Sequence, residues 1–117
     1  MNEEDIEKVY VIDNSLGALE YEIVGVIRRI PIEHRGMSKN GIPWTLGGVL
    51  LEVPDKERSH QLYLTVWGDE LVETVNRYGI GKRVCVKFHL DSREKNGFFS
   101  TNAVLDTIKI DLQKNEI

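Results

Sequence analysis

The sequence predicts an all-β fold, a five-stranded barrel with one short helix between the third and fourth strands. In residues 60–67 apolar side chains take every second position, with Leu62, Leu64 and Val66 between Tyr63, Thr65 and Trp67. Residues 83–91 alternate in the same way, whereas residues 70–78 place apolar side chains at helical spacing. Strict alternation is typical of a half-buried strand, and the 3.6-residue period is typical of a helix.

The first half of the chain supplies two more strands. Residues 20–32 are rich in β-branched side chains, and Gly25 within them predicts a bulge or sharp bend, as a small barrel requires in a strand that pairs on both sides. Residues 33–42 are predicted to form a loop around Asn40-Gly41, a dipeptide that favours hairpin turns. The strand at 43–53 contains Gly47-Gly48, which allow another backbone or a flat ligand to approach closely.

The second half completes the predicted fold. Gly68 ends the strand at 60–67, Asp69 is expected to cap a helix over residues 70–78, and Gly79 fits the C-cap. The next strand spans 83–91, residues 91–97 are expected to turn the chain, and residues 98–110 return as the last strand. This order outlines the oligonucleotide/oligosaccharide-binding (OB) fold. An SH3-like barrel has the same strand count, but the helix favours the OB fold.

Charge is unevenly distributed along the 117 residues. The net charge is −4, but residues 1–20 carry −5 and the remainder carries +1. We therefore expect an acidic N-terminal arm over 1–19, one OB-fold domain over 20–110 and a short polar tail over 111–117. A near-neutral barrel binds nucleic acid through a local basic groove and base stacking, with a small dependence on salt.

Several classes of protein are disfavoured. Cys85 is the only cysteine, which rules out an intramolecular disulfide and predicts a reducing, cytoplasmic location. The sequence contains no run of 18 apolar residues, so it predicts no membrane span. The three histidines lack metal-ligand spacing, and no phosphate-binding loop, dinucleotide fingerprint or Ser-His-Asp signature is present, so we expect no enzyme activity, metal or cofactor. Arg83 and Lys87 flank Cys85 and favour a lowered thiol pKa, although a lone strand cysteine is more often inert packing.

Short motifs in the second half resemble bacterial single-stranded DNA-binding proteins. The matching patterns are Trp67-Gly68, Gly81-x-x-Val84-x-Val86 and Leu90-x-x-Arg93. Small SSB-like bacterial domains share three further motifs, which here are Asn40-Gly41-x-x-Trp44, Val66-Trp67-Gly68-Asp69 and Ser92-Arg93-Glu94-x-Asn96-Gly97. The resemblance spans residues 20–110. It implies an OB fold, binding of single-stranded DNA and a homo-oligomer.

Aromatic side chains are the first candidates for contacting a ligand. Trp67 should point away from Leu64 and Val66, and it matches the position at which the resembled family places a base-stacking ring. Tyr63 shares its face, and Trp44 follows the loop at which OB ligands enter. In the alternative interpretation, Trp67 closes a barrel end or fills an interface, and Trp44 plugs the core. Of Phe98 and Phe99, we expect one to face inward and one outward.

Basic side chains in two loops are the second group of candidates. Arg35 and Lys39 lie in the loop after the first strand, and Arg93 and Lys95 lie in the loop before the last. These loops flank the ligand face of OB folds, which predicts phosphate contacts. The alternative is solvated surface charge. Other bases extend the track or cover the outside of the barrel: Arg28, Arg29, Lys82, Arg83 and Lys87.

The sequence thus predicts non-catalytic, sequence-tolerant binding of single-stranded DNA. One alternative is a protein-interaction or oligomerisation module with the same barrel and no nucleic acid. Another is binding of single-stranded RNA, which nothing in the sequence separates from DNA. A homo-oligomer is expected because apolar outer positions would otherwise stay exposed, at Val11, Ile12, Ile108 and Ile110.

Overall fold

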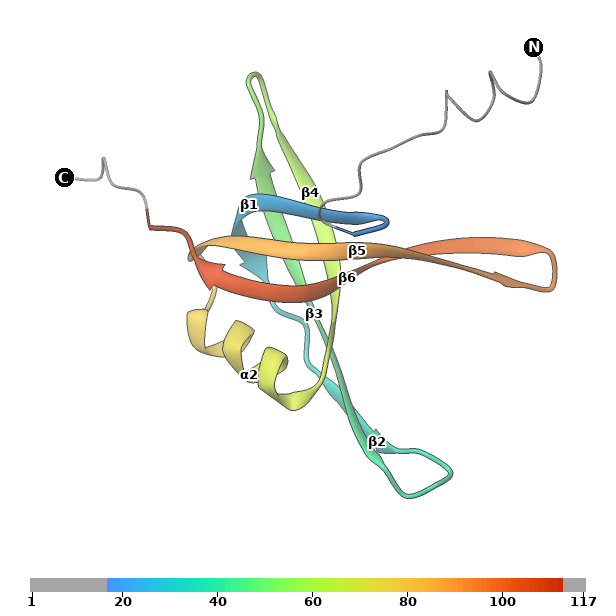
Figure 1. Cartoon of the computed structure of the whole chain (residues 1–117). Helices are drawn as coiled ribbons and strands as arrows, with labels where there is room; N and C mark the ends of the chain where they lie inside the picture. The colour runs from blue at the N-terminus through green and yellow to red at the C-terminus, as the bar shows by residue number, and fades with distance from the viewer. Residues whose placement is uncertain (1–16, 113–117) are drawn as a thin grey trace, which may run out of the picture.

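The structure, a computed structural model, describes residues 17–112 and consists of one mostly antiparallel sheet with a single helix (Figure 1). The elements are β1 (Glu20–Arg29), β2 (His34–Met37), β3 (Pro43–Pro54), β4 (Ser59–Trp67), α2 (Asp69–Tyr78), β5 (Arg83–Lys95) and β6 (Phe98–Ile110). The strand order is β1-β5-β6-β4-β3-β2, and β1 also pairs with β3. Five strands therefore close on themselves, as predicted, and β2 is added at one side. Most of the predicted acidic arm and polar tail lies outside the described residues.

β1 pairs on both sides of the closed ring. Its first part, from Glu20 to Val26, pairs with β5, and its last part, from Val26 to Arg29, pairs with β3. The register shifts between Ile27 and Arg29, so the bulge lies later than the predicted position at Gly25. Gly25 instead allows close approach of β3, because a Cβ at Gly25 would lie 3.0 Å from the carbonyl oxygen of Glu52.

The predicted loop at residues 33–42 contains a strand. β2 pairs antiparallel with the start of β3, and Gly36 lies opposite Trp44. The connecting turn contains Asn40-Gly41 as predicted, and Gly41 has a φ of +78° that favours glycine. The amide of Ser38 donates a hydrogen bond of 2.8 Å to the carbonyl of Ile42. Figure 1 shows the resulting β2–β3 hairpin projecting from the barrel.

A second projecting hairpin joins β5 and β6 (Figure 1). We expected the strand to end at Asp91, but it continues to Lys95, and only Asn96-Gly97 form the turn. Both turn residues have positive φ values, 53° and 82°. Such a two-residue turn matches the right-handed twist of paired strands, so pairing extends to the tip.

The core lies inside the closed ring and under α2. Strand residues Ile27, Val49, Leu51, Leu64, Val66, Val84 and Val86 are fully buried. Val72 and Val75 bury one face of α2 against them, as the helical spacing predicts. The amide of Gly79, the predicted C-cap, donates a hydrogen bond of 3.0 Å to Val75. No helix among the described residues is long and apolar enough to cross a membrane.

Candidate nucleic-acid interface

Three aromatic side chains lie on the outer face of β3 and β4. Trp44 is 39% exposed, Tyr63 49% and Trp67 50%. Because directly paired residues point to the same face, Trp67 lies beside Leu46 and Tyr63 lies beside Leu50. Between them along β4, Leu64 and Val66 point into the core. The predicted outward orientation of Trp67 is confirmed, and the alternative of Trp44 as a core plug is wrong.

Glycines allow two of these rings to lie over the neighbouring strand. A Cβ at Gly36 would overlap the ring of Trp44, and a Cβ at Gly48 would overlap the hydroxyl end of Tyr63. Each ring therefore covers bare backbone and presents its other side to solvent. Gly47 points the opposite way, and a Cβ there would lie 3.1 Å from Val72 of α2. The adjacent glycines thus admit an aromatic ring on one face and the helix on the other.

Two hollows flank Tyr63 on this outer face. The first, of about 130 Å³, lies over Gly47 and Gly48. Its full lining is Pro31, Ile32, His34, Leu46, Gly47, Gly48, Tyr63 and Thr65. The second, of about 170 Å³, is lined by Arg29, Pro31, Leu50 and Tyr63. Both are bounded by Pro31, which belongs to the segment between β1 and β2, so this connection forms one wall of a groove along β3 and β4.

Arg29 lines this groove, whereas the sequence placed it only among the bases that extend the track or cover the outside of the barrel. The bulge between Ile27 and Arg29 places Arg29 opposite Leu50, whose partner on β4 is Tyr63. Arg29 is exposed and makes no hydrogen bond or ion pair within residues 17–112, whereas the adjacent Arg28 is held by Glu52 at 2.7 Å. The sequence shows the adjacent pair Arg28-Arg29 but not which of the two faces the groove. The position of the bulge decides this.

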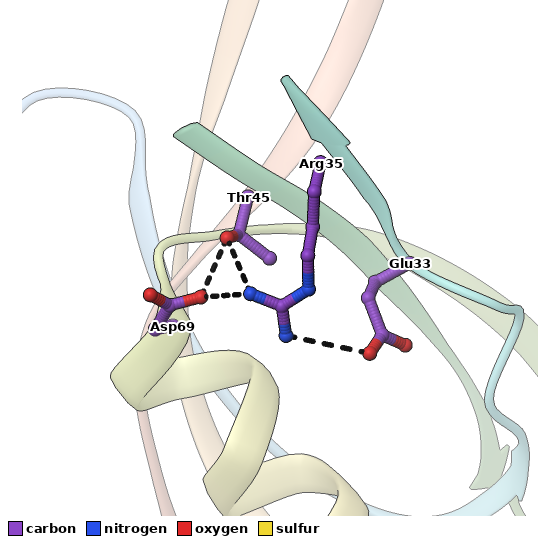
Figure 2. Close-up of polar contacts among 4 residues, drawn as sticks. All are labelled: Glu33, Arg35, Thr45 and Asp69. Atoms are coloured by element: carbon purple, nitrogen blue, oxygen red, sulfur yellow. Dashed lines mark hydrogen bonds and ion pairs between the residues drawn. The ribbon is translucent and has the colours of Figure 1, made fainter. Parts of the chain in front are cut away.

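By register, Arg35 lies on the opposite face of β2 and β3 from Trp44. Figure 2 shows its guanidinium between Asp69, Thr45 and Glu33. Its Nη1 donates hydrogen bonds of 2.6 Å to Asp69 Oδ1 and 3.1 Å to Thr45 Oγ1, and its Nη2 lies 3.5 Å from Glu33. The Thr45 hydroxyl also donates to Asp69, at 2.5 Å. The network fixes β2 against the start of α2, so the structure does not bring Arg35 together with the aromatic face.

Asp69 has a different role from the one predicted. The N-cap position is Gly68, and no side chain caps the helix. Asp69 is the first helical residue, and its carboxylate turns towards Thr45 and Arg35. The hydrogen bond from Thr45, and then that from Arg35, hold the pKa of Asp69 below its usual value. Hydrogen bonds to the charged form of a carboxyl stabilise that form, which explains the direction.

This shift predicts an acid-dependent loss of stability. Because the folded-state pKa of Asp69 is lowered, its contribution to the free energy of unfolding is present above the unfolded value of about 3.9 and disappears as pH falls through the folded pKa. In Asp69→Asn, we expect this part of the pH dependence to be missing. Urea unfolding of both proteins from neutral pH down to acid checks it. Parallel stability curves for the two proteins would contradict it.

The remaining basic candidates lie on the two projecting hairpins. Lys39 is exposed in the turn between β2 and β3. Arg93 and Lys95 are exposed on β5, where Arg93 lies 3.5 Å from Asp91 in a solvent-exposed ion pair. The two hairpins point in different directions from the barrel (Figure 1), so these bases do not form one cluster. They lie at separate edges of the outer face.

The outer face is continuous from β4 to the β5–β6 hairpin. Thr65 pairs with Val104 on β6, and Val104 pairs with His89 on β5. Since β4 and β6 are parallel, moving from Thr65 to Tyr63 leads in the same direction as moving along β5 from His89 to Arg93. An extended ligand that crosses Tyr63 can therefore reach Arg93 without leaving this face.

Phe98 and Phe99 form the tip of that hairpin, and both are strongly exposed, at 79% and 76%. The expectation that one faces inward is wrong. By register they point to opposite faces, Phe98 beside Lys95 and Phe99 beside Glu94. The hairpin extends beyond the barrel, so neither face has a core to cover.

The surroundings of Cys85 favour the neutral thiol. Burial, and next its hydrogen bond of 3.4 Å to Glu22, raise the pKa of the Cys85 thiol. The expected lowering by Arg83 and Lys87 is therefore wrong, and the alternative of inert packing fits better. A raised thiol pKa reduces the thiolate fraction and with it the nucleophilicity.

Comparison with known proteins places this architecture among OB folds. No protein-family model matches the chain, and no curated protein matches it. Among solved structures, it is similar to the mitochondrial single-stranded DNA-binding protein Rim1 from S. cerevisiae (TM-score 0.58, 16% identity, covering 78% of this chain and 92% of that one). It is also similar to the N-terminal domain of PriB from Thermoanaerobacter tencongensis (TM-score 0.56, 21% identity, covering 80% of this chain and 97% of that one). A third similar structure is the second OB-fold domain of replication protein A from Methanococcus maripaludis (TM-score 0.57, 17% identity, covering 84% of this chain and 89% of that one). The predicted OB fold is confirmed.

Proposed function

We propose that this protein binds single-stranded DNA on the outer face of β3 and β4, in a sequence-tolerant manner and without catalysis. Bases stack on Trp67, Trp44 and Tyr63. Phosphates are neutralised by Arg29 beside the groove and by Lys39, Arg93 and Lys95 on the hairpins. Arg35 is left out because its guanidinium is already held by Asp69 and Thr45.

The observation that carries this proposal is the aromatic outer face itself. Half-exposed rings on one face of two paired strands leave apolar surface in water, and such surface is typical of a binding site. Gly36 and Gly48 let Trp44 and Tyr63 lie over backbone, so each ring offers a broad side to a base. Stacking suits every base, because every base has a π-face. One of the similar OB structures, Rim1, is a mitochondrial single-stranded DNA-binding protein, which supports the same ligand.

A fluorescence titration with oligo-dT tests the proposal. Bases that stack on Trp67 or Trp44 quench their emission, so we expect saturable quenching that weakens as salt rises. Four phosphate contacts would give a slope of about −3 in a plot of log K against log salt, from about −0.7 for each contact on a single strand. The absence of quenching and of any salt-dependent binding at low salt would overturn the proposal. The same titration with oligo-U compares DNA with RNA.

Replacement of Arg93 by glutamine should reduce the salt dependence. If Arg93 contacts one phosphate, its loss lowers the magnitude of the slope by about 0.7 and weakens binding to all sequences alike. Arg58→Gln, in the exposed turn between β3 and β4, is the matched control and should keep the wild-type slope. An Arg93→Gln slope equal to that of the control would remove Arg93 from the site.

A protein-interaction module is the second candidate function, and the β5–β6 tip favours it. Phe98 and Phe99, next to the Asn96-Gly97 turn, present two large apolar side chains to solvent on opposite faces of the hairpin. A homo-oligomer remains our expectation, which rests on four apolar positions in the sequence. Ile108 packs partly against the core and Ile110 is exposed. Val11 and Ile12 lie outside the described residues. Sedimentation of wild type and of a Phe98→Ser, Phe99→Ser variant tests this. A fall in oligomer size without loss of oligo-dT binding would assign the tip to assembly.

A further inference from the structure

The hollow over Gly47 and Gly48 has the form of a slot for one flat ring. Its floor is the backbone of Gly47 and Gly48, and the hydroxyl end of Tyr63 lies over Gly48 at one side of it. Pro31 and Ile32 form one wall, and Tyr63 forms the other. Its volume of about 130 Å³ is well below the roughly 300–1,000 Å³ of pockets for drug-sized ligands. A single planar ring system is the size of ligand it admits.

Three polar side chains around this slot have no hydrogen-bond partner among the described residues. The imidazole of His34, the hydroxyl of Tyr63 and the hydroxyl of Thr65 line it, and none of the three makes a side-chain hydrogen bond within residues 17–112. A hydroxyl group can donate and accept hydrogen bonds. A neutral imidazole donates one through one ring nitrogen and accepts one at the other. The slot thus combines stacking surfaces with groups that can bond the polar edge of a ring.

The second hollow complements the first. It lies on the other side of Tyr63, shares the wall at Pro31, and adds the apolar side chain of Leu50 and the charge of Arg29. The guanidinium of Arg29 has no carboxylate partner in the described part of the chain, so it is available to an anion. Arginine suits phosphate because its planar fork of donors matches the phosphate oxygens.

We infer that the slot over Gly47 and Gly48 holds one base of a bound strand and distinguishes its edge through Thr65, His34 and the Tyr63 hydroxyl, while Arg29 binds the phosphate beyond the Tyr63 ring. This inference rests on the proposed function. It adds one base-discriminating position to a face that otherwise binds by stacking. Stacking alone gives only modest preferences among bases. Edge contacts separate thymine from cytosine, because thymine offers an acceptor where cytosine offers an amino donor.

Thr65→Val tests this with little risk to folding, because valine keeps the β-branched shape and favours strands. The affinities of wild type and variant are measured by fluorescence anisotropy with labelled dT and dC homopolymers of about 16 nucleotides, the upper site size of one OB fold. We expect wild type to prefer one homopolymer by about 2- to 10-fold, as one or two neutral hydrogen bonds give. In Thr65→Val the ratio should move towards one. Thr107→Val, at an exposed position of β6, is the matched control and should keep the wild-type ratio.

A second variant acts on the slot from its floor. Gly48→Ala places a methyl group where the Tyr63 hydroxyl lies and so displaces the ring. We expect it to remove the dT–dC difference and to weaken binding of both strands. Equal binding of dT and dC by wild type, or an unchanged ratio in Thr65→Val and Gly48→Ala, would overturn the inference while leaving the proposed function intact. If wild type binds neither strand, the proposed function falls and the inference falls with it.

Discussion

Replacement of Trp67 by alanine is expected to weaken oligo-dT binding by about 5- to 150-fold, the equivalent of roughly 1–3 kcal/mol for one lost base–aromatic stack. Trp67 is half-exposed on the outer face, and its strand neighbour Val66 points into the core. The side chain therefore contributes little to the core, and we propose that it mainly contacts the ligand. We expect the free energy of unfolding to change far less than the free energy of binding.

The measurement is an anisotropy titration at fixed low salt, together with sedimentation and urea unfolding of the same samples. Trp67→Phe keeps a stacking ring and should recover most of the affinity. Ile80→Ala, another exposed apolar side chain between α2 and β5, is the control and should bind as wild type does. If Trp67→Ala binds oligo-dT normally but dissociates to a smaller oligomer, Trp67 belongs to an interface, as the alternative interpretation holds.

Local patterns in the sequence predicted the elements that local physics determines. Alternation in β4 assigned Leu64 to the core and Trp67 to the outside, because a strand sends successive side chains to opposite faces. The helix followed from apolar spacing between Gly68 and Gly79, and its buried residues are those that the spacing predicted. The OB order followed because short connections leave few ways to close five strands around one core.

Features that depend on distant contacts were missed. β2 has only four residues and includes Gly36, so its pattern predicts no strand; it forms because Trp44 covers that glycine and because Arg35 reaches Asp69, 34 residues away. The same ion pair holds Arg35 on the face away from Trp44. Sequence spacing carries no information about such a partner.

Register decided the rest of the site. A one-residue shift changes the face to which a strand side chain points, so the bulge after Ile27 placed Arg29 beside Leu50 and Tyr63. The predicted bend was two residues too early, at Gly25, and left Arg28 and Arg29 indistinguishable. The β5–β6 hairpin was predicted too short because residues 91–97 are polar, whereas the Asn96-Gly97 turn allows pairing to its tip.

Leu64→Ala provides the complementary experiment on the same strand. Leu64 lies between Tyr63 and Thr65 but is fully buried among the core residues, so its truncation leaves a cavity. We expect the free energy of unfolding to fall by about 2–5 kcal/mol, the range for large-to-small changes in a core. Urea unfolding measures it, with Gln61→Ala at an exposed position of β4 as the control, for which a change of about 0.5 kcal/mol or less is expected.

The two variants separate the faces of β4. Under conditions in which Leu64→Ala stays folded, its affinity for oligo-dT should remain close to that of wild type, whereas Trp67→Ala should lose affinity and retain stability. This opposite pattern follows from one strand that packs a barrel with its inner side chains and presents rings with its outer ones. A Leu64→Ala protein as stable as Gln61→Ala would mean that the inner face of β4 is not the core. Equal losses of affinity in both variants would mean that binding depends on the whole barrel rather than on its aromatic face.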